Sequence, residues 1–286
     1  MIWYNEFVAH EPELVGKRKK VDNTIYTFDI ETSNYIILNG KILPAIEYDK
    51  LTEDEQKEAQ FRSFMYIWQF GINDTIYYGR TWEQFYSFLV RLDYFNQNKK
   101  IVFIHNLSFE FQYLKSVFAF SEVTARKKHK VMKCQMRDFN IEMHCTYFMS
   151  NAALSQLPKL FMLPVEKKTG DLDYDLIRTP ETEMTTKELG YCEYDCLVVY
   201  HYIRRMLETY ERVDKIPITS TRTSKARIKR DSTKGLGVQK QSKKSSKCKS
   251  AYIQFITRCI CRRIYTRKLD MGGRYCKACR ELGFYE

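Results

Sequence analysis

TIYTFDIETSN, residues 24–34, is the stretch of this 286-residue sequence that decides the fold. β-Branched and aromatic residues dominate its first half, so we predict a strand over residues 24–30. Because successive residues of a strand point to opposite faces, Asp29 and Glu31 share one face and their apolar neighbours share the other. Two such carboxylates repel each other, and a divalent cation between them would relieve that repulsion. A strand end that emerges into water is the alternative, and a lone D-x-E pattern favours it.

The segments that follow alternate between strand and helix patterns. Apolar and β-branched runs predict hairpins and a short strand, whereas apolar residues three and four apart predict helices. The strands are expected over residues 64–72 and 75–79, 100–105, and 130–136 and 140–148, and the helices over 81–95, 107–118, 152–161 and 185–212. This order predicts a mixed α/β layer fold of about 200 residues.

Composition excludes several classes of protein. The chain has 18 Phe, 21 Tyr and three Trp, which is far more aromatic surface than a disordered chain carries. No window approaches the roughly 20 apolar residues that a membrane helix needs, so we expect no membrane partner. Nine cysteines at irregular spacings, with no secretory signal pattern, indicate reduced thiols and a cytoplasmic location.

The basic excess of the chain lies at one end. The net charge is +12, and residues 212–286 hold 21 Lys and Arg against 5 Asp and Glu. Such asymmetry favours contact with a polyanion, nucleic acid before membrane, and predicts salt-sensitive binding to DNA. A basic segment that is only well solvated is the alternative, which charge alone leaves open. Residues 213–250 are rich in Lys, Ser and Gly, and we predict a flexible linker there.

A second acidic motif follows a later strand. In IVFIHNLSFEFQYL, residues 101–114, the strand is expected to end at His105–Asn106, and a helix that carries Phe109 and Glu110 begins. Chemistry in α/β folds gathers just beyond the ends of central strands, so Glu110 is a candidate site residue. The alternative for Asn106 is that its side chain caps the helix, and for His105 a core or capping role is favoured.

The third motif, YCEYDCLVVYHYI, begins at residue 191 in the longest helical pattern of the chain. Tyr191 and Asp195 are four residues apart and therefore share one face of that helix. The phenol could hold a water molecule while the carboxylate binds metal, although this pair alone is a weak signal.

Taken in order, D-x-E, N-x-x-F-E and Y-x-x-x-D resemble the Exo I, Exo II and Exo III motifs of DEDDy 3′→5′ exonucleases, which have a ribonuclease H-like fold. With the flanking HCTYFMSNAALSQLPKLFMLP and GDLDY, the sequence is similar to the N-terminal half of a protein-primed family B DNA polymerase, an enzyme of phages and linear plasmids. The resemblance implies an exonuclease domain over residues 1–212. Residues 213–250 would be the linker, and residues 251–286 a truncated remnant of the connection to the polymerase.

The resemblance also implies site residues. Two Mg²⁺ or Mn²⁺ ions, about 4 Å apart, would activate water and stabilise the leaving 3′-oxygen. The metal ligands would be Asp29, Glu31, Glu110 and Asp195, with Glu110 in the place of the usual Asp, and Tyr191 would orient the attacking water. The residues implied to contact single-stranded DNA are Thr32, Asn106, Phe109, Leu154, Lys167 or Lys168, and Tyr174. Ala153 stands where a serine ligand of DNA is usual.

The expected activity is therefore proofreading hydrolysis of DNA. Palm motifs of the types D-x-x-S-L-Y-P, K-x-x-x-N-S-x-Y-G and D-T-D do not occur in the sequence, so polymerisation by this chain alone is not expected. The partners implied are the 3′ end of single-stranded DNA and a terminal protein or a separate polymerase chain. If a phage encodes the chain, its location is the host cytoplasm.

A non-catalytic module that binds single-stranded DNA or terminal protein is the rival interpretation. It would keep the fold with inert acids, and Mg²⁺-dependent nuclease activity would distinguish the two. A zinc site at the C-terminal end is a further alternative, because four cysteines there have spacings that zinc could use. These are Cys259, Cys261, Cys276 and Cys279.

Overall fold

The computed structural model describes residues 1–16, 20–165, 172–173 and 176–221. Residues 1–220 form one compact unit, which holds all the elements given below. The boundary predicted at residues 212–213 stays a prediction. Val213 and Ile216, just beyond it, are buried in a core cluster together with residues of the preceding helix.

A mixed sheet of nine strands lies at the centre of the described residues. Its order is β1 (Ile2–Trp3), β7 (Thr75–Gly79), β6 (Gln60–Ile72), β4 (Tyr26–Leu38), β8 (Lys100–Ile104), β11 (Ile141–Cys145), β10 (Val131–Met136) and β9 (Phe120–Ala125), and β5 (Lys41–Pro44) pairs with β4. β4, β8 and β11 are parallel neighbours, and β1 is parallel to β7, whereas the other pairs are antiparallel. A small second sheet joins β2 (Leu14–Val15) to β3 (Val21–Asp22).

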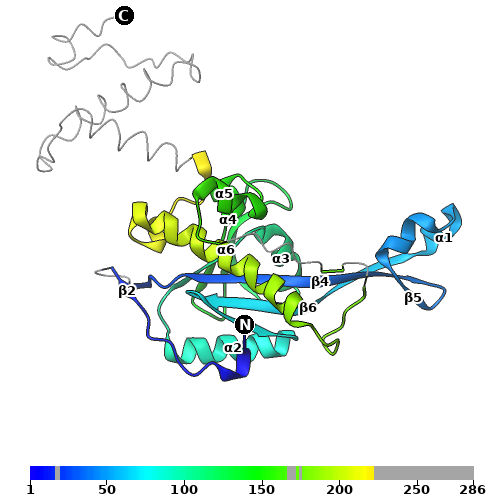
Figure 1. The fold of residues 1–286 in the computed structure, drawn as a ribbon, viewed down its shortest axis with the longest axis horizontal. Helices are drawn as coiled ribbons and strands as arrows, with labels where there is room; N and C mark the ends of the chain where they lie inside the picture. Colours follow the sequence, from blue (N-terminus) through cyan, green and yellow to red (C-terminus); the bar gives the residue numbers. More distant parts are fainter. Residues whose placement is uncertain (17–19, 166–171, 174–175, 222–286) are drawn as a thin grey trace, which may run out of the picture. The chain divides into compact units, whose positions relative to one another are not determined.

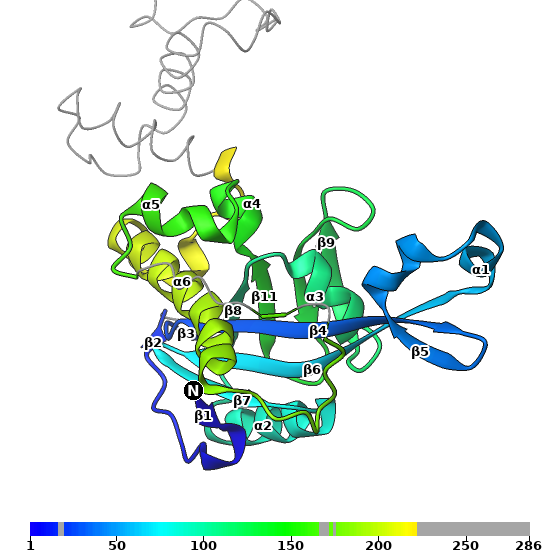
Figure 2. The same cartoon turned by 45° about the vertical axis from the view of Figure 1, so that its right-hand side comes forward.

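Helices cover both faces of the sheet, which confirms the mixed α/β prediction (Figures 1 and 2). They are α1 (Glu53–Glu58), α2 (Trp82–Phe95), α3 (Leu107–Leu114), α4 (Thr146–Ser150), α5 (Leu157–Phe161) and α6 (Thr186–Tyr210), with short 3₁₀ turns η1 (Tyr4–Glu6), η2 (Ala45–Lys50), η3 (Leu154–Gln156) and η4 (Val213–Lys215). Among the described residues, no helix combines the length and apolar character needed to cross a bilayer.

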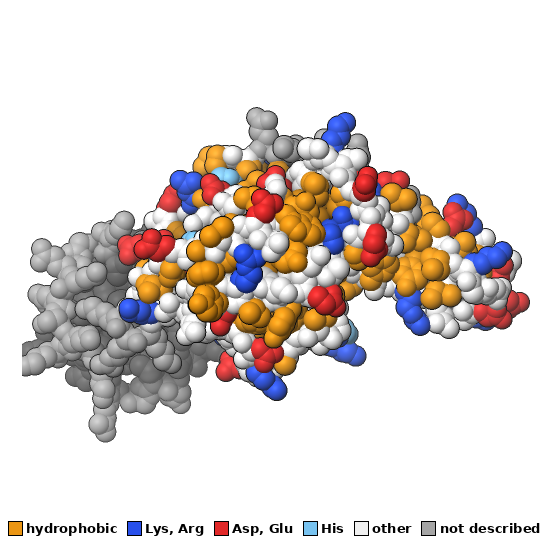
Figure 3. Space-filling view, turned by 90° about the horizontal axis from the view of Figure 1, so that it is seen from below, with side chains coloured by type: hydrophobic (Ala, Val, Ile, Leu, Met, Phe, Trp, Pro, Cys, Tyr) orange, Lys and Arg blue, Asp and Glu red, His pale blue; other side chains and the backbone are white. Residues whose placement is uncertain are grey.

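The alternation predicted for the deciding strand is confirmed. Tyr26, Phe28 and Ile30 are buried in the core cluster that includes the inner face of α2, and the Phe28 ring stacks on Phe85 at 4.8 Å. The other face of β4 lies under α6, which supplies a second buried cluster with β8. The outer side of α2 leaves Tyr86, Val90, Tyr94 and Phe95 exposed, and hydrophobic side chains are spread over this side of the molecule (Figure 3).

The strand predicted over residues 24–30 continues to Leu38. Beyond Glu31 it pairs with β5 and with the first half of β6, and this extension carries α1 away from the body (Figures 1 and 2). The strand predicted from the sequence ends at Ile30, before the polar residues Ser33 and Asn34. Ser33 is instead buried, and its hydroxyl accepts a hydrogen bond from the backbone N–H of Arg178 at 2.8 Å.

Two predicted helices differ from the structure. The helix predicted over residues 107–118 ends at Leu114. The apolar spacing extends further in the sequence because Phe118, after the turn that follows the helix, also packs in the core. The helix predicted over residues 152–161 is broken into η3 and α5, and α4 precedes it. Left-handed backbone at Asn151, with φ of 56°, ends α4 there. The edge strand β9, mostly exposed, was not predicted.

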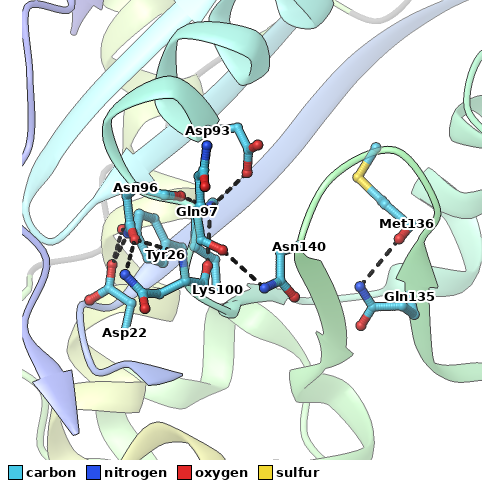
Figure 4. A network of polar contacts seen from close by, with 10 residues as sticks. Asp22, Tyr26, Asp93, Asn96, Gln97, Lys100, Gln135, Met136 and Asn140 are labelled. Carbon is cyan, nitrogen blue, oxygen red and sulfur yellow. Dashed lines mark hydrogen bonds and ion pairs between the residues drawn. The ribbon is translucent and has the colours of Figure 1, made fainter. Parts of the chain in front are cut away.

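A buried polar network fixes the start of the deciding strand (Figure 4). The fully buried carboxylate of Asp22 accepts hydrogen bonds from the Tyr26 hydroxyl, from Asn96 Nδ2 at 2.5 Å and from the backbone N–H of Thr24 at 3.0 Å. The buried Lys100 ammonium donates to the Asn96 carbonyl and to Asp93. These bonds join the segment before β4 to the end of α2 and the start of β8.

Replacing Asp22 by Ala should therefore destabilise the fold strongly. The substitution leaves several buried donors without an acceptor, for which we expect a loss of about 3 kcal/mol and a fall in Tm of roughly 6–12 °C. Thermal unfolding followed by circular dichroism measures this. Asp54→Ala is the control, because the Asp54 carboxylate lies in an exposed ion pair and its loss should leave Tm unchanged. Equal Tm values for the two variants would contradict the role of the network.

Candidate metal centre

Three carboxylates from distant parts of the chain meet on the α6 side of the sheet. Asp29 and Glu31 extend from β4, and Asp195 extends from α6. One carboxylate oxygen of each lies within 4.8 Å of the others. The strand period brings the first two together, and α6, whose start is fixed by the Thr185 capping box, brings the third. The sequence motifs predicted this convergence, and such a set of oxygens is suited to a hard divalent cation.

A β-bulge shapes the wall beside Glu31. In the pairing of β4 with β6, Glu31 lies opposite Ile67 and Thr32 lies opposite Met65, so Tyr66 is an extra residue of β6. Tyr66 and Ile67 therefore belong to one buried cluster under α6, although they are adjacent in the sequence. The bulge places an aromatic ring next to the acidic group, and burial, followed by the charge of Glu31, raises the pKa of Tyr66.

Glu110 lies close to these three acids but outside the tight group. It sits in the first turn of α3, directly after β8, and is buried with its Oε2 atom lacking a hydrogen-bond partner. The negative charge of Glu110 contributes to the raised pKa of Asp29. A buried, unpartnered carboxylate oxygen beside three other acids favours a further ligand for a cation, either directly or through water.

All four acids hold their protons more tightly than ordinary carboxyl groups. Burial raises the pKa of Asp29 well above its usual value, and Asp195, Glu31 and Glu110 raise it further, in that order. Burial, followed by Asp195, raises the pKa of Glu31 to about 8. Burial raises the pKa of Glu110 to about 8 and that of Asp195 to about 7. Burial is the largest cause at each acid, and repulsion from neighbouring acids adds to it at Asp29, Glu31 and Glu110.

The positive charge of Arg178 lowers the pKa of Glu31, against the effects of burial and Asp195, and the sequence motifs did not predict this residue. Arg178 is 3% exposed, and its guanidinium donates to Glu188 at 2.5 Å and lies 5.9 Å from the centre of the Tyr66 ring. Glu188 also closes the capping box of α6. Arg178 thus links the start of α6 to the site. It lies in a polar stretch, GDLDYDLIRTPETE, where nothing in the pattern indicates burial.

Tyr191 lies on α6 one turn before Asp195, as predicted. It is half-buried and packs against the cluster formed around Tyr66, Ile67 and Cys192. The role in holding water stays a prediction. Glu188, one turn earlier on the same helix, is engaged by Arg178 and by the Thr185 cap.

The residues expected to contact DNA lie around the same end of the sheet, and their roles stay predictions. Thr32 is half-buried on β4, Phe109 is 39% exposed at the start of α3, and Leu154 is half-buried at the start of η3. Asn106 stands at the N-cap position of α3, yet its side chain makes no capping hydrogen bond, which contradicts the structural alternative for it. Lys167, Lys168 and Tyr174, and the four C-terminal cysteines, lie outside the described residues.

The carboxyl ends of β8 and β11 add two residues to this edge. His105 follows β8, and its Nδ1 atom lies 3.0 Å from the Thr146 hydroxyl, just after β11. Burial lowers the pKa of His105 to about 4, so the ring is neutral at pH 7, and the core or capping role expected of it stays a prediction. Tyr147, 41% exposed and 6.0 Å from the His105 ring, is an aromatic residue at this edge that the motifs did not predict.

No family model matches the chain, and no curated protein matches it. Among solved structures it is similar to Phi29 DNA polymerase. The ternary complex with primer-template DNA and incoming nucleotides gives a TM-score of 0.48 at 12% identity over 67% of this chain. The complex with single-stranded DNA gives 0.47 at 13% identity over 66%, and the orthorhombic crystal form gives 0.47 at 11% over 69%. In each case the match covers 32% of the polymerase chain.

Proposed function

We propose that residues 1–212 form a ribonuclease H-like 3′→5′ exonuclease domain of the kind found in protein-primed family B DNA polymerases. The observation that carries this proposal is the convergence of Asp29, Glu31 and Asp195, with Glu110 beside them. Their order along the chain and the motifs around them resemble the three exonuclease motifs. A solvated strand end, the alternative for the D-x-E pair, does not agree with a Glu31 side chain that is 8% exposed.

The donor set fits hard divalent cations. Four carboxylates with raised pKa values and a buried, unpartnered oxygen on Glu110 are the chemistry expected of a site for Mg²⁺ or Mn²⁺. Asp29, Glu31 and Asp195 would hold the metal, and Glu110 would complete the set. Two such ions, when bound, supply the activation of water and the stabilisation of the leaving 3′-oxygen.

The chain's own residues would orient the reaction. The Tyr191 phenol, one turn from Asp195, would hold the attacking water in line. Arg178, which is buried and lies beside the Tyr66 ring at the β-bulge, would hold Glu31 in its orientation. Phe109 and Tyr147, the exposed rings at the strand ends, would stack on the unpaired terminal bases.

The proposed substrate is the 3′ end of single-stranded DNA, and the proposed role is proofreading during DNA replication. A terminal protein or a separate polymerase chain would be the protein partner. The location would be the cytoplasm, that of the host cell if a phage encodes the chain.

Hydrolysis of end-labelled oligonucleotides tests this proposal. A single-stranded oligonucleotide labelled at its 5′ end should shorten stepwise with Mg²⁺ or Mn²⁺, and release of mononucleotides should stop with EDTA. A 5′-phosphorothioate block should leave the rate unchanged, whereas a 3′-phosphorothioate block should slow it. Tight DNA binding without any product in either metal would refute the nuclease and favour the non-catalytic binding module.

A further inference from the structure

Gln69 is a buried polar residue that the proposed reaction does not use. It lies in the second half of β6 and is 0% exposed. Neither its Nε2 nor its Oε1 atom has a hydrogen-bond partner among the described residues. Buried polar groups in folded proteins are nearly always hydrogen-bonded, and an unpartnered side-chain amide is costly. Such an amide calls for a partner beyond the protein contacts in this structure, either an ordered water molecule or a group that comes within reach when the protein binds something.

The position of Gln69 points to its partner. In the register of β4 with β6, Gln69 is directly opposite Asp29. Cross-strand partners share a face of the sheet, and their Cβ atoms are about 4.5–5.5 Å apart, so the Gln69 and Asp29 side chains start side by side on the face that α6 covers. The Asp29 carboxylate accepts a hydrogen bond from the backbone N–H of Ile30 and retains further acceptor positions.

Another buried polar side chain, Thr27, lies next to this pair. The neighbouring pair on the same two strands is Thr27 with Gly71. A Cβ atom at Gly71 would lie 2.2 Å from the buried Thr27 hydroxyl oxygen, so the glycine leaves the space that this hydroxyl occupies. Thr27, Asp29 and Gln69 therefore form a row of polar side chains on the α6 side of the sheet, between the two apolar clusters that include residues of α6.

We propose that Gln69 is a positioning residue for Asp29, and that its Nε2–H donates to one carboxylate oxygen while another oxygen binds the divalent cation. This inference rests on the proposed function. Ligating carboxylates generally need such outer partners to hold their orientation. A neutral amide suits the position, because a Lys or Arg there would neutralise Asp29 and compete with the cation.

Mn²⁺ binding to the full chain, followed by the electron paramagnetic resonance of free Mn²⁺, tests the proposal without requiring activity. Gln69→Met keeps the side-chain volume and removes the donor, and we expect it to weaken Mn²⁺ binding about 10- to 100-fold. Its metal-free Tm should be equal to or above that of the unmodified chain, since an unpartnered amide has been removed. Gln135→Met is the matched control, because Gln135 is a half-buried strand residue that donates to the Met136 carbonyl away from the acids.

The outcomes separate the two proposals. Unchanged Mn²⁺ affinity in Gln69→Met would overturn the positioning role, and a lowered metal-free Tm with unchanged affinity would show that Gln69 only supports the fold. If the methionine variant does not fold, Gln69→Leu provides the same comparison. If the unmodified chain binds no Mn²⁺, the proposed function itself fails, and the role of Gln69 fails with it.

Discussion

Asp29→Ala should lower the Mg²⁺-dependent release of nucleotides from single-stranded DNA by at least about a thousandfold, a loss of roughly 4 kcal/mol of transition-state stabilisation. Asp29 is the centre of the acidic group, because the charges of Asp195, Glu31 and Glu110 all act on it. The measurement is the single-turnover rate on an end-labelled oligonucleotide.

The metal-free stability of the same variant provides an independent readout. Removing one of four crowded acids reduces their repulsion, so the Tm of Asp29→Ala in EDTA should be equal to or above that of the unmodified chain. Asp54→Ala, at an exposed position on α1, should keep both full activity and the same Tm. Undiminished hydrolysis by Asp29→Ala would refute the assignment of the site.

Mn²⁺ affinity should fall steeply as the pH is lowered from 8 to 6. The pKa values of Glu31 and Glu110 are raised to about 8 and that of Asp195 to about 7, so protons must leave before the metal binds. If one or two protons are displaced per ion, affinity should change about 50- to 500-fold over this range. Calorimetric titration in buffers of different ionisation enthalpy measures both the affinity and the number of protons released.

The same pKa shifts give the sign of the stability change without metal. A carboxyl group with a raised pKa in the fold contributes its stability at low pH, and that contribution is lost as the pH rises through the raised value. The metal-free Tm should therefore fall between pH 5 and pH 8, and Mn²⁺ should restore it most at pH 8. Glu142→Gln is the control, because hydrogen bonding to His144 lowers the pKa of Glu142. Removing this carboxylate should leave the dependence of Mn²⁺ affinity on pH unchanged. An affinity independent of pH would contradict this account.

Local periodicity predicted the parts of the site that depend on a single element. The two-residue period of β4 placed Asp29 and Glu31 on one face, and the four-residue spacing on α6 aligned Tyr191 with Asp195. Their meeting across more than 160 residues of sequence followed from the resemblance to known motifs, and the structure confirms it for three of the four acids.

The parts that were missed depend on register and burial. Gln69 faces Asp29 only because β6 pairs with β4 in one register, and the bulge at Tyr66 changes which side chains face α6 beyond that point. Arg178 is buried by contacts with Glu188 and the Tyr66 ring, which lie elsewhere in the sequence. Strand pairing of this kind leaves no periodic signal in either strand alone.

Anomalous diffraction from crystals soaked in Mn²⁺ would test the central claim most directly. We predict at least one anomalous peak within about 2.3 Å of oxygens of Asp29, Glu31 and Asp195. A second peak near Asp29 would extend this to the two-ion arrangement, and Glu110 should lie close enough to reach it through water. Well-ordered crystals with these three side chains in place and no anomalous density between them at millimolar Mn²⁺ would contradict the claim that the acids form a metal centre.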